Sequence, residues 1–175
     1  IRGQREDYDG WRQLGCEGWS YDDVKPYFLR SQHQERGADD WNATGGPLNV
    51  SDMRDGHPVS DAVIDACVQA GLPRLEDLNA AQQEGATWFQ VTMKNGRRWS
   101  AAVAYLHPVL KRSNLVVETG SLATRVLFRE KRAVGVEFRQ GDRVLQSRAS
   151  CEVIVACGAI GSPQLLQASG IGDPE

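Results

Sequence analysis

The feature that most constrains the fold is an apolar run that leads directly into a loop of small residues and then a helix. Residues 153–156 have the sequence Val-Ile-Val-Ala, which is typical of a strand buried in a parallel sheet. The loop Gly158-Ala159-Ile160-Gly161 has little side-chain bulk, so another group can approach its backbone closely. We expect Ser162 to cap the helix with Pro163 in its first position, and Gly170 to end it. Such a βα unit can bind an anionic or polar group at its turn, although a purely structural turn fits the spacing equally well.

Composition excludes several classes of protein. The chain has 175 residues, of which 41% are hydrophobic and 25% charged, and its net charge is −3. No apolar run approaches the ~18 residues of a membrane span, and no basic stripe indicates nucleic acid binding. Four widely spaced cysteines form no CxxC pair, so we expect no metal site and reduced thiols. With no leader-like segment at the start, the expected location is cytoplasmic, and association with a membrane surface stays open.

The first half of the chain predicts short helices and loops. Ser20 and Asp23 fit a capping box, which starts a helix that we expect to break or restart at Pro26. Apolar residues at helical spacing predict a second helix over 59–70. The other expectations are an irregular stretch over 5–19, a surface loop over 33–46, strands over 47–50 and 88–92, a turn at Asn95-Gly96 and a short helix over 101–106.

The second half predicts strands. The segments 123–128, 133–138 and 144–149 are joined by short charged turns, which indicates an antiparallel meander. A further strand is expected over 115–119, and the last run, 152–156, is apolar from Val153 onward and is expected at the centre of a parallel sheet. The predicted fold class is therefore α/β, with α+β elements that rejoin a parallel sheet of the nucleotide-binding type.

The final loop and helix also carry a longer pattern. Small residues, Ser162-Pro163, two aliphatic residues and then Ser169-Gly170-Ile171-Gly172 resemble the second signature of the glucose-methanol-choline (GMC) family of flavin oxidoreductases. The resemblance extends to Asp7-Tyr8-Asp9-Gly10-Trp11, Gly45-Gly46-Pro47-Leu48 and Asn95-Gly96-Arg97-Arg98. It implies part of a Rossmann-like FAD-binding domain with an antiparallel β-meander and the edge of a substrate-binding domain. On this basis residues 1–50 link the two domains, and residues 51–175 form the FAD-domain segment with the meander and the final βα unit.

The resemblance also implies an activity. GMC enzymes use FAD and oxidise an alcohol to an aldehyde or ketone by hydride transfer to the flavin, and this sequence is most similar to the choline and alcohol dehydrogenase branch. The implied acceptor is oxygen or a quinone, and a homo-oligomer stays open. The family's GxGxxG and its catalytic histidine have no counterpart among these residues. We therefore expect a middle segment that is inactive alone, and we assign no catalytic residue.

Two places are candidate cofactor contacts by the same resemblance. One is the loop Ala156, Cys157, Gly158 and Ala159, beside the nucleotide part of FAD, and the other is Ala123, whose backbone faces the adenine in the family. Trp88 and Phe89 are candidates for the border of the substrate channel, although core packing explains most tryptophans in such a chain.

Other interpretations stay open at this stage. His33, His57 and His107 have no sequence neighbours that suggest a base or a ligand, so a structural or solvated role is expected. The alternative function is a non-enzymatic, stand-alone binding module that keeps part of the flavoprotein fold. An NAD-linked enzyme is disfavoured because no dinucleotide fingerprint is present.

Overall fold

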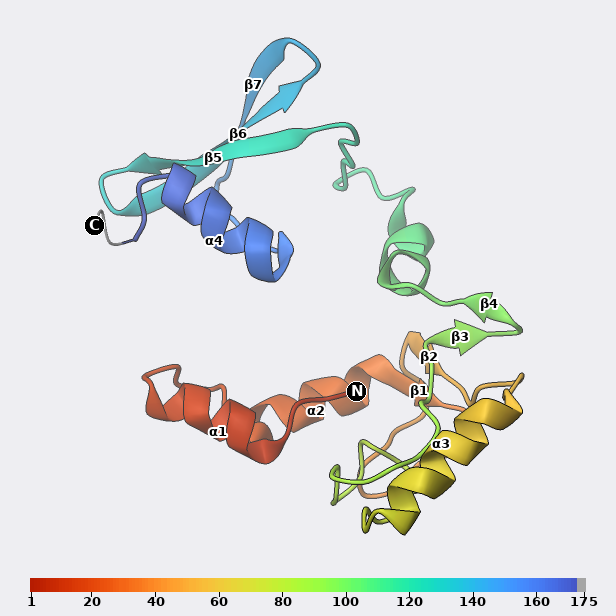
Figure 1. Ribbon diagram of the computed structural model, residues 1–175. Coiled ribbons are helices and arrows are strands. Elements are labelled where there is room, and N and C mark those ends of the chain that lie inside the picture. The colour runs from red at the N-terminus through yellow and green to blue at the C-terminus, as the bar shows by residue number, and fades with distance from the viewer. Residues whose placement is uncertain (173–175) are drawn as a thin grey trace. The chain divides into compact units, whose positions relative to one another are not determined.

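The computed structural model describes residues 1–172 (Figure 1). The chain divides into two compact units, Ile1–Leu115 and Val116–Glu175, and each is described here by itself. The predicted division at residue 50 assigns segments to the domains of a larger protein, so it stays a prediction.

The first unit begins with a helix where the sequence suggested irregular chain. Helix α1 spans Arg5–Gln13, and its start is stabilised by the Asp7 carboxylate, which accepts a hydrogen bond from the Gln4 amide at 2.7 Å. The acidic residues in the first turn also stabilise the helix, because their negative charges lie near the positive end of the helix dipole. Tyr8 on α1 is buried against Tyr21 and Phe28, with ring centroids 6.1 and 5.9 Å away. The prediction of an irregular stretch over 5–19 was therefore wrong over α1. Its capping box uses Gln4 and Asp7, and glutamine is not one of the usual N-cap residues.

Helix α2, Tyr21–Ser31, confirms the predicted cap and contradicts the predicted break. The Ser20 hydroxyl accepts from the Asp23 amide at 3.3 Å, and the Asp23 carboxylate accepts from the Ser20 amide at 3.1 Å. Pro26 lies inside the helix, which continues through it. A proline there removes only the hydrogen bond to the carbonyl of Asp22. The capping box and the packing of the aromatic residues against α1 keep the helix continuous.

Two short strands pair in parallel, and the first of them overlaps the segment expected to be a surface loop. Strand β1, Gln32–Gln34, pairs with β2, Leu48–Val50, and β2 confirms the strand predicted over 47–50. The side chains of Gln32, Gln34 and Asn49 are buried. Polar residues concealed this strand in the sequence. Their buried side-chain amides donate within the protein, from Gln32 to Asn42, from Gln34 to Gln90, and from Asn49 to Glu35 and the Met93 carbonyl.

The rest of the first unit largely follows the predicted elements. Helix α3 spans Pro58–Gln69, and a hairpin of β3, Met93–Lys94, and β4, Arg97–Arg98, turns at Asn95-Gly96, where both residues have positive φ. The helix predicted over 101–106 is formed, but as the π-helical turn η1, Ala102–Leu106, followed by the 3-10 turn η2, His107–Val109. The strand predicted over 88–92 is reduced to one bridge, from Val91 to Ser51.

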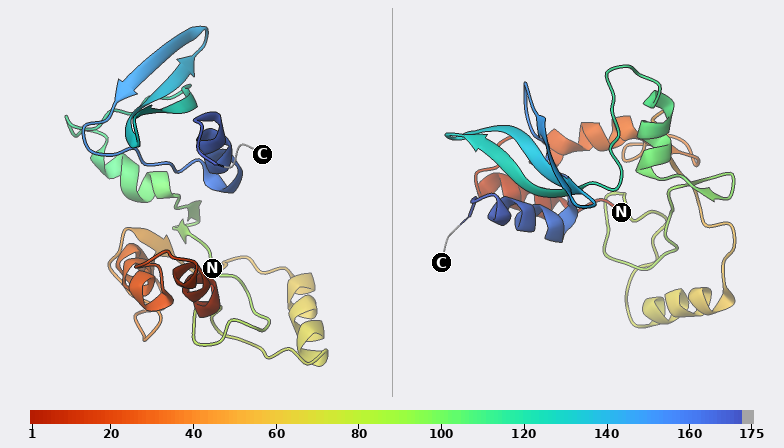
Figure 2. Two further views of the ribbon diagram at one scale, coloured as in Figure 1. Left: turned by 90° about the vertical axis from the view of Figure 1, so that its left-hand side faces the viewer. Right: turned by 90° about the horizontal axis from the view of Figure 1, so that it is seen from above.

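The second unit contains the predicted meander. Strands β5, Leu122–Arg129, β6, Arg132–Gln140, and β7, Arg143–Arg148, form an antiparallel sheet in the order β5-β6-β7. Helix α4, Gly158–Ala168, lies beside β5 (Figure 2). Val126 of β5 and Leu165 of α4 are buried apolar side chains. This arrangement makes β5 the strand through which the sheet and the helix are joined.

Two predicted strands are not formed within the part of the chain that the structure describes. Residues 115–119 and 152–156 pair with no strand, and Ile154 is 79% exposed. An apolar run becomes a strand only where a neighbouring strand supplies hydrogen bonds, and no described strand lies beside either segment. The parallel sheet expected around 152–156 is therefore absent from these residues.

Candidate functional site

The segment 156–159, which leads into α4 and forms its first residues, has an open and accessible backbone. Ala156, Cys157, Gly158 and Ala159 are all exposed. Gly158 has a φ of 85°, in the left-handed region, and no atom lies within 4 Å of the position that a Cβ would take. Because the first amides of a helix have no carbonyl one turn earlier, the Gly158 and Ala159 amides are available to an approaching acceptor. Four of the five predicted cofactor contacts, which are consecutive in the sequence, thus lie exposed around the start of α4.

The helix after this loop begins earlier than the sequence predicted. Its N-cap is Cys157, and the Cys157 amide donates to the Ser162 hydroxyl at 3.0 Å. Ser162 is therefore not the N-cap, and Pro163 lies inside the helix rather than at its first position. The left-handed Gly158 lets the chain turn directly from the extended segment, so the helix starts before Ser162. The serine still satisfies an amide near the helix start, but from within the helix.

The end of α4 agrees with the prediction. Gly170 has a φ of 82°. Its amide donates to the Gln167 carbonyl at 3.0 Å, and the Ile171 amide donates to the Leu166 carbonyl at 3.0 Å. These two bonds form a Schellman motif, which a glycine in the left-handed conformation favours.

The fifth predicted cofactor contact, Ala123, lies on β5 and is half-buried. It pairs with Phe138, and the register of β5 against β6 shifts between Ala123 and Arg125. Further along β5, the Val126 amide donates to the Ser169 hydroxyl at 2.8 Å, which joins the strand to the end of α4. Ala123 and the loop at 156–159 therefore belong to adjacent elements of the same unit.

The two candidate substrate residues, Trp88 and Phe89, lie in the first unit and have different surroundings. The Trp88 indole N–H donates to the Asp61 carboxylate of α3 at 2.7 Å, and the side chain is half-buried. Phe89 is 58% exposed and lines an apolar cavity of about 450 Å³ with Ile64 and Cys67 of α3. Only Phe89 therefore lies on an accessible cavity wall.

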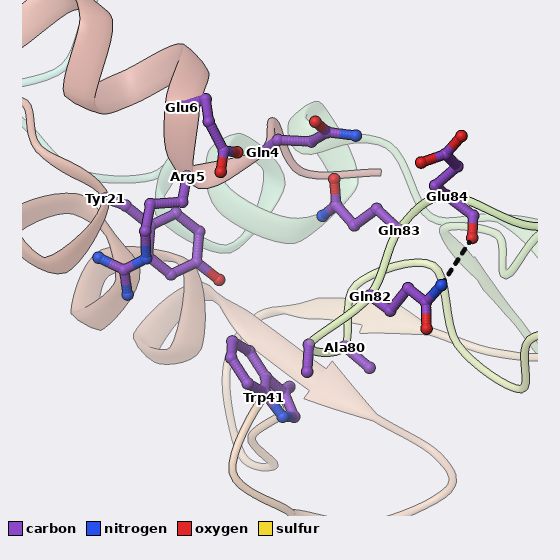
Figure 3. A pocket seen from close by; sticks show the side chains of 10 residues that line it. Gln4, Arg5, Glu6, Tyr21, Trp41, Ala80, Gln82, Gln83 and Glu84 are labelled. Atoms are coloured by element: carbon purple, nitrogen blue, oxygen red, sulfur yellow. Dashed lines mark hydrogen bonds between the residues drawn. The ribbon is translucent and has the colours of Figure 1, made fainter.

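The first unit also contains a polar cavity that no sequence motif predicts. It has a volume of about 320 Å³, and Figure 3 shows the ring of Tyr21 beside Arg5, the ring of Trp41 beside Ala80, and Gln82 directed toward Glu84. The remaining lining residues are Gln4, Arg5, Glu6, Ala80, Ala81 and Glu84. Its walls come from segments that are far apart in the sequence, so no local motif could have revealed it.

Two arginines of the first unit, Arg5 in this cavity and Arg2, are held by hydrogen bonds. The Arg5 guanidinium donates to both carboxylate oxygens of Asp22, at 2.7 and 2.9 Å, which lowers the pKa of Asp22 and raises that of Arg5. Arg2 donates to the Trp41 carbonyl at 2.5 Å and to the Gln32 amide oxygen at 2.6 Å, and burial lowers the pKa of its guanidinium. These bonds give the arginines structural roles.

Two of the histidines also have structural roles, as expected. The His33 Nδ1 accepts from the Gly45 amide at 2.9 Å, and the His57 Nδ1 accepts from the Val59 amide at 3.2 Å at the start of α3. His107 is exposed in η2. Among residues 1–172, no group of three or more His, Cys, Asp or Glu side chains could hold a metal ion. Nor is any helix in that range long and apolar enough to cross a membrane.

Comparison with known proteins identifies relatives along the whole chain. Residues 1–175 match the family model described as GMC oxidoreductase. The mitochondrial choline dehydrogenase of Homo sapiens is 47% identical over 175 residues, which cover 100% of this chain and 30% of that protein. The oxygen-dependent choline dehydrogenase of Pseudomonas putida is 48% identical over 177 aligned positions, which cover 98% of this chain and 31% of that protein. The chain thus spans about 30% of the length of these relatives.

Solved structures show the same fold. Pyridoxine 4-oxidase from Mesorbium loti matches with a TM-score of 0.86 at 33% identity, covering 98% of this chain and 34% of that one. An FAD-dependent oxidoreductase from Chaetomium thermophilum matches with a TM-score of 0.86 at 30% identity, covering 98% and 32%. Both likenesses extend over nearly all of the chain, so they include the meander, α4 and the loop that precedes it.

Proposed function

Because the chain belongs to the GMC oxidoreductase family, we propose that it forms part of an FAD-dependent enzyme that oxidises a primary or secondary alcohol to an aldehyde or ketone. The observation that carries this proposal is the family match over residues 1–175. The identity of 47% to a choline dehydrogenase over the full chain supports it. In this proposal the chain supplies a part of the FAD site and lacks the base that takes the hydroxyl proton.

The segment 156–159 fits the nucleotide part of FAD. Its residues are small and exposed, and the space beside Gly158 is open to a ligand. The Cys157 amide is occupied by Ser162, so the Gly158 and Ala159 amides are the donors that would hold an anionic or polar group of the cofactor. Ala123 would contribute its backbone from β5. When bound, FAD supplies the acceptor for the hydride of the alcohol.

We propose choline as the first substrate to test, because several relatives are named choline dehydrogenases. Phe89 is the candidate contact for the substrate, since it is exposed on an apolar cavity wall. The indole of Trp88 is hydrogen-bonded to Asp61, so in this proposal Trp88 positions Phe89 and does not touch the substrate. The proposed electron acceptor is oxygen or a quinone.

The test uses the full-length gene product, loaded with FAD and kept without oxygen. Choline and its uncharged analogue 3,3-dimethylbutan-1-ol are added separately, together with a set of aliphatic and aromatic alcohols, and the flavin absorption is followed. We expect bleaching by at least one alcohol, and faster bleaching by choline than by its analogue. Bleaching by another alcohol alone would overturn the choline assignment, and bleaching by none would overturn the proposed activity.

A further inference from the structure

We propose that Ser169 is a positioning residue for the cofactor site, because its hydroxyl fixes β5 against α4. The inference rests on the proposed function, since the two elements that Ser169 joins are the ones that carry the candidate FAD contacts. Ala123 lies on β5, and the loop at 156–159 leads into α4. Ser169 itself lies at the far end of α4 from that loop, so it would act through the two elements and not by touching the cofactor.

The Ser169 hydroxyl makes two hydrogen bonds to two different elements. It accepts from the Val126 amide of β5 at 2.8 Å and donates to the Leu165 carbonyl of α4 at 2.5 Å. Because β5 is an edge strand of its sheet, its outward amides have no strand partner. Val126 is only 5% exposed, so loss of the serine would leave a buried amide without its acceptor.

The apolar contact between the two elements is small, which gives this polar link its importance. Val126 and Leu165 are the buried apolar side chains of the second unit within residues 116–172. Both residues are also the backbone partners of Ser169, one through its amide and the other through its carbonyl. The hydroxyl therefore sets the position of the helix along the strand at the point where the two elements pack.

A simpler role for Ser169 would be to stabilise only the C-terminal end of α4. Serines in helices often bond to the carbonyl one turn earlier, and the bond to Leu165 alone would fit that role. It does not account for the bond to Val126, which lies 43 positions away in the sequence. The link between two elements is thus the property to be tested.

The first experiment compares Ser169→Ala and Ser147→Ala in the full-length gene product. Ser147 is an exposed serine of β7 whose side chain makes no hydrogen bond within the described residues, so it serves as the matched control. The dissociation constant of FAD for each apoprotein is measured by quenching of flavin fluorescence. We expect Ser169→Ala to weaken FAD binding about tenfold, which corresponds to ~1.4 kcal/mol, and Ser147→Ala to leave it unchanged. Ser169→Thr, which keeps the hydroxyl, should restore most of the affinity.

The outcomes separate this inference from the proposed function. If the wild-type protein does not bind FAD, the proposed function fails. If it binds FAD and Ser169→Ala binds equally well, or only melts at a lower temperature, the positioning role is overturned. A second measurement needs no variant: FAD binding to the wild type should slow hydrogen exchange in residues 122–129. Unchanged exchange there on binding FAD would also overturn the inference.

Discussion

Two glycines show how the same backbone conformation serves different purposes at the two ends of α4. Gly158 and Gly170 have φ values of 85° and 82°, and neither has an atom within 4 Å of its missing Cβ. Gly170 ends the helix, where its own amide is bonded to Gln167. Gly158 begins the helix, where the amides are free of helical partners. The first glycine therefore has a candidate binding role that the second lacks.

We predict that Gly158→Ala and Gly170→Ala lower the free energy of unfolding of the full-length gene product by similar amounts, about 1–2 kcal/mol each. Only Gly158→Ala should also weaken FAD binding, because its new methyl group occupies space beside the candidate cofactor amides. Chemical denaturation gives the first quantity and flavin fluorescence the second. Equal FAD affinity in the two variants would remove the loop at 156–159 from the cofactor site.

At the level of elements, one carboxylate of the meander adds side-chain hydrogen bonds from the central strand to both of its neighbours. Glu137 of β6 accepts from Arg125 and Thr124 of β5 and from Gln146 of β7, at distances from 2.8 to 3.3 Å. The hydrogen bonds from Arg125 are the main reason that the pKa of Glu137 lies below its ordinary value, and burial opposes them. The cluster lies next to the register shift that follows Ala123.

This cluster predicts a pH-dependent contribution to stability. A lowered pKa in the folded state means that the ionised carboxylate stabilises the fold above its unfolded pKa, near 4.5, and that this contribution is lost as the pH falls through the folded value. Glu137→Gln should therefore destabilise the full-length gene product at neutral pH, and the difference from the wild type should shrink below pH 4.5. Chemical denaturation of both proteins across a pH series measures this difference in the free energy of unfolding.

The control for this prediction is Asp142→Asn, which removes an exposed carboxylate from the turn between β6 and β7 that accepts no hydrogen bond within the described residues. It should show no such pH dependence. A difference between Glu137→Gln and the wild type that stays constant down to acidic pH would show that the carboxylate contributes nothing specific to the meander.

The elements that the sequence predicted well are those with a strong local signal. The meander, α3, the Asn95-Gly96 turn and the Gly170 helix end all rest on periodicity or on turn residues, and all are formed. Strand β1 was missed because its buried residues are polar, and the break at Pro26 was wrong because packing outweighs one lost hydrogen bond. The link from Ser169 to Val126 joins distant positions and has no local signal.

At the scale of the whole molecule, the segment 152–156 contains the apolar run Val153–Ala156 and pairs with no strand within the described residues, and the relatives are about three times as long as this chain. We predict that in the full-length gene product this segment is a strand paired on both sides, as its sequence suggests. Its amides should then exchange hydrogen as slowly as those of β6. Exchange as fast as that of the turn at 140–142 would show that the segment is no strand and would weaken the assignment of this region to a Rossmann-like sheet.

The visible absorption spectrum of the full-length gene product, purified without added flavin, tests most directly whether this chain is part of an FAD-dependent alcohol-oxidising enzyme. We predict the two visible flavin bands, release of FAD on denaturation, and bleaching of the bands when an alcohol substrate is added without oxygen. A colourless protein that takes up no FAD on reconstitution and reacts with no alcohol would contradict the account, and would favour a fold kept for binding alone.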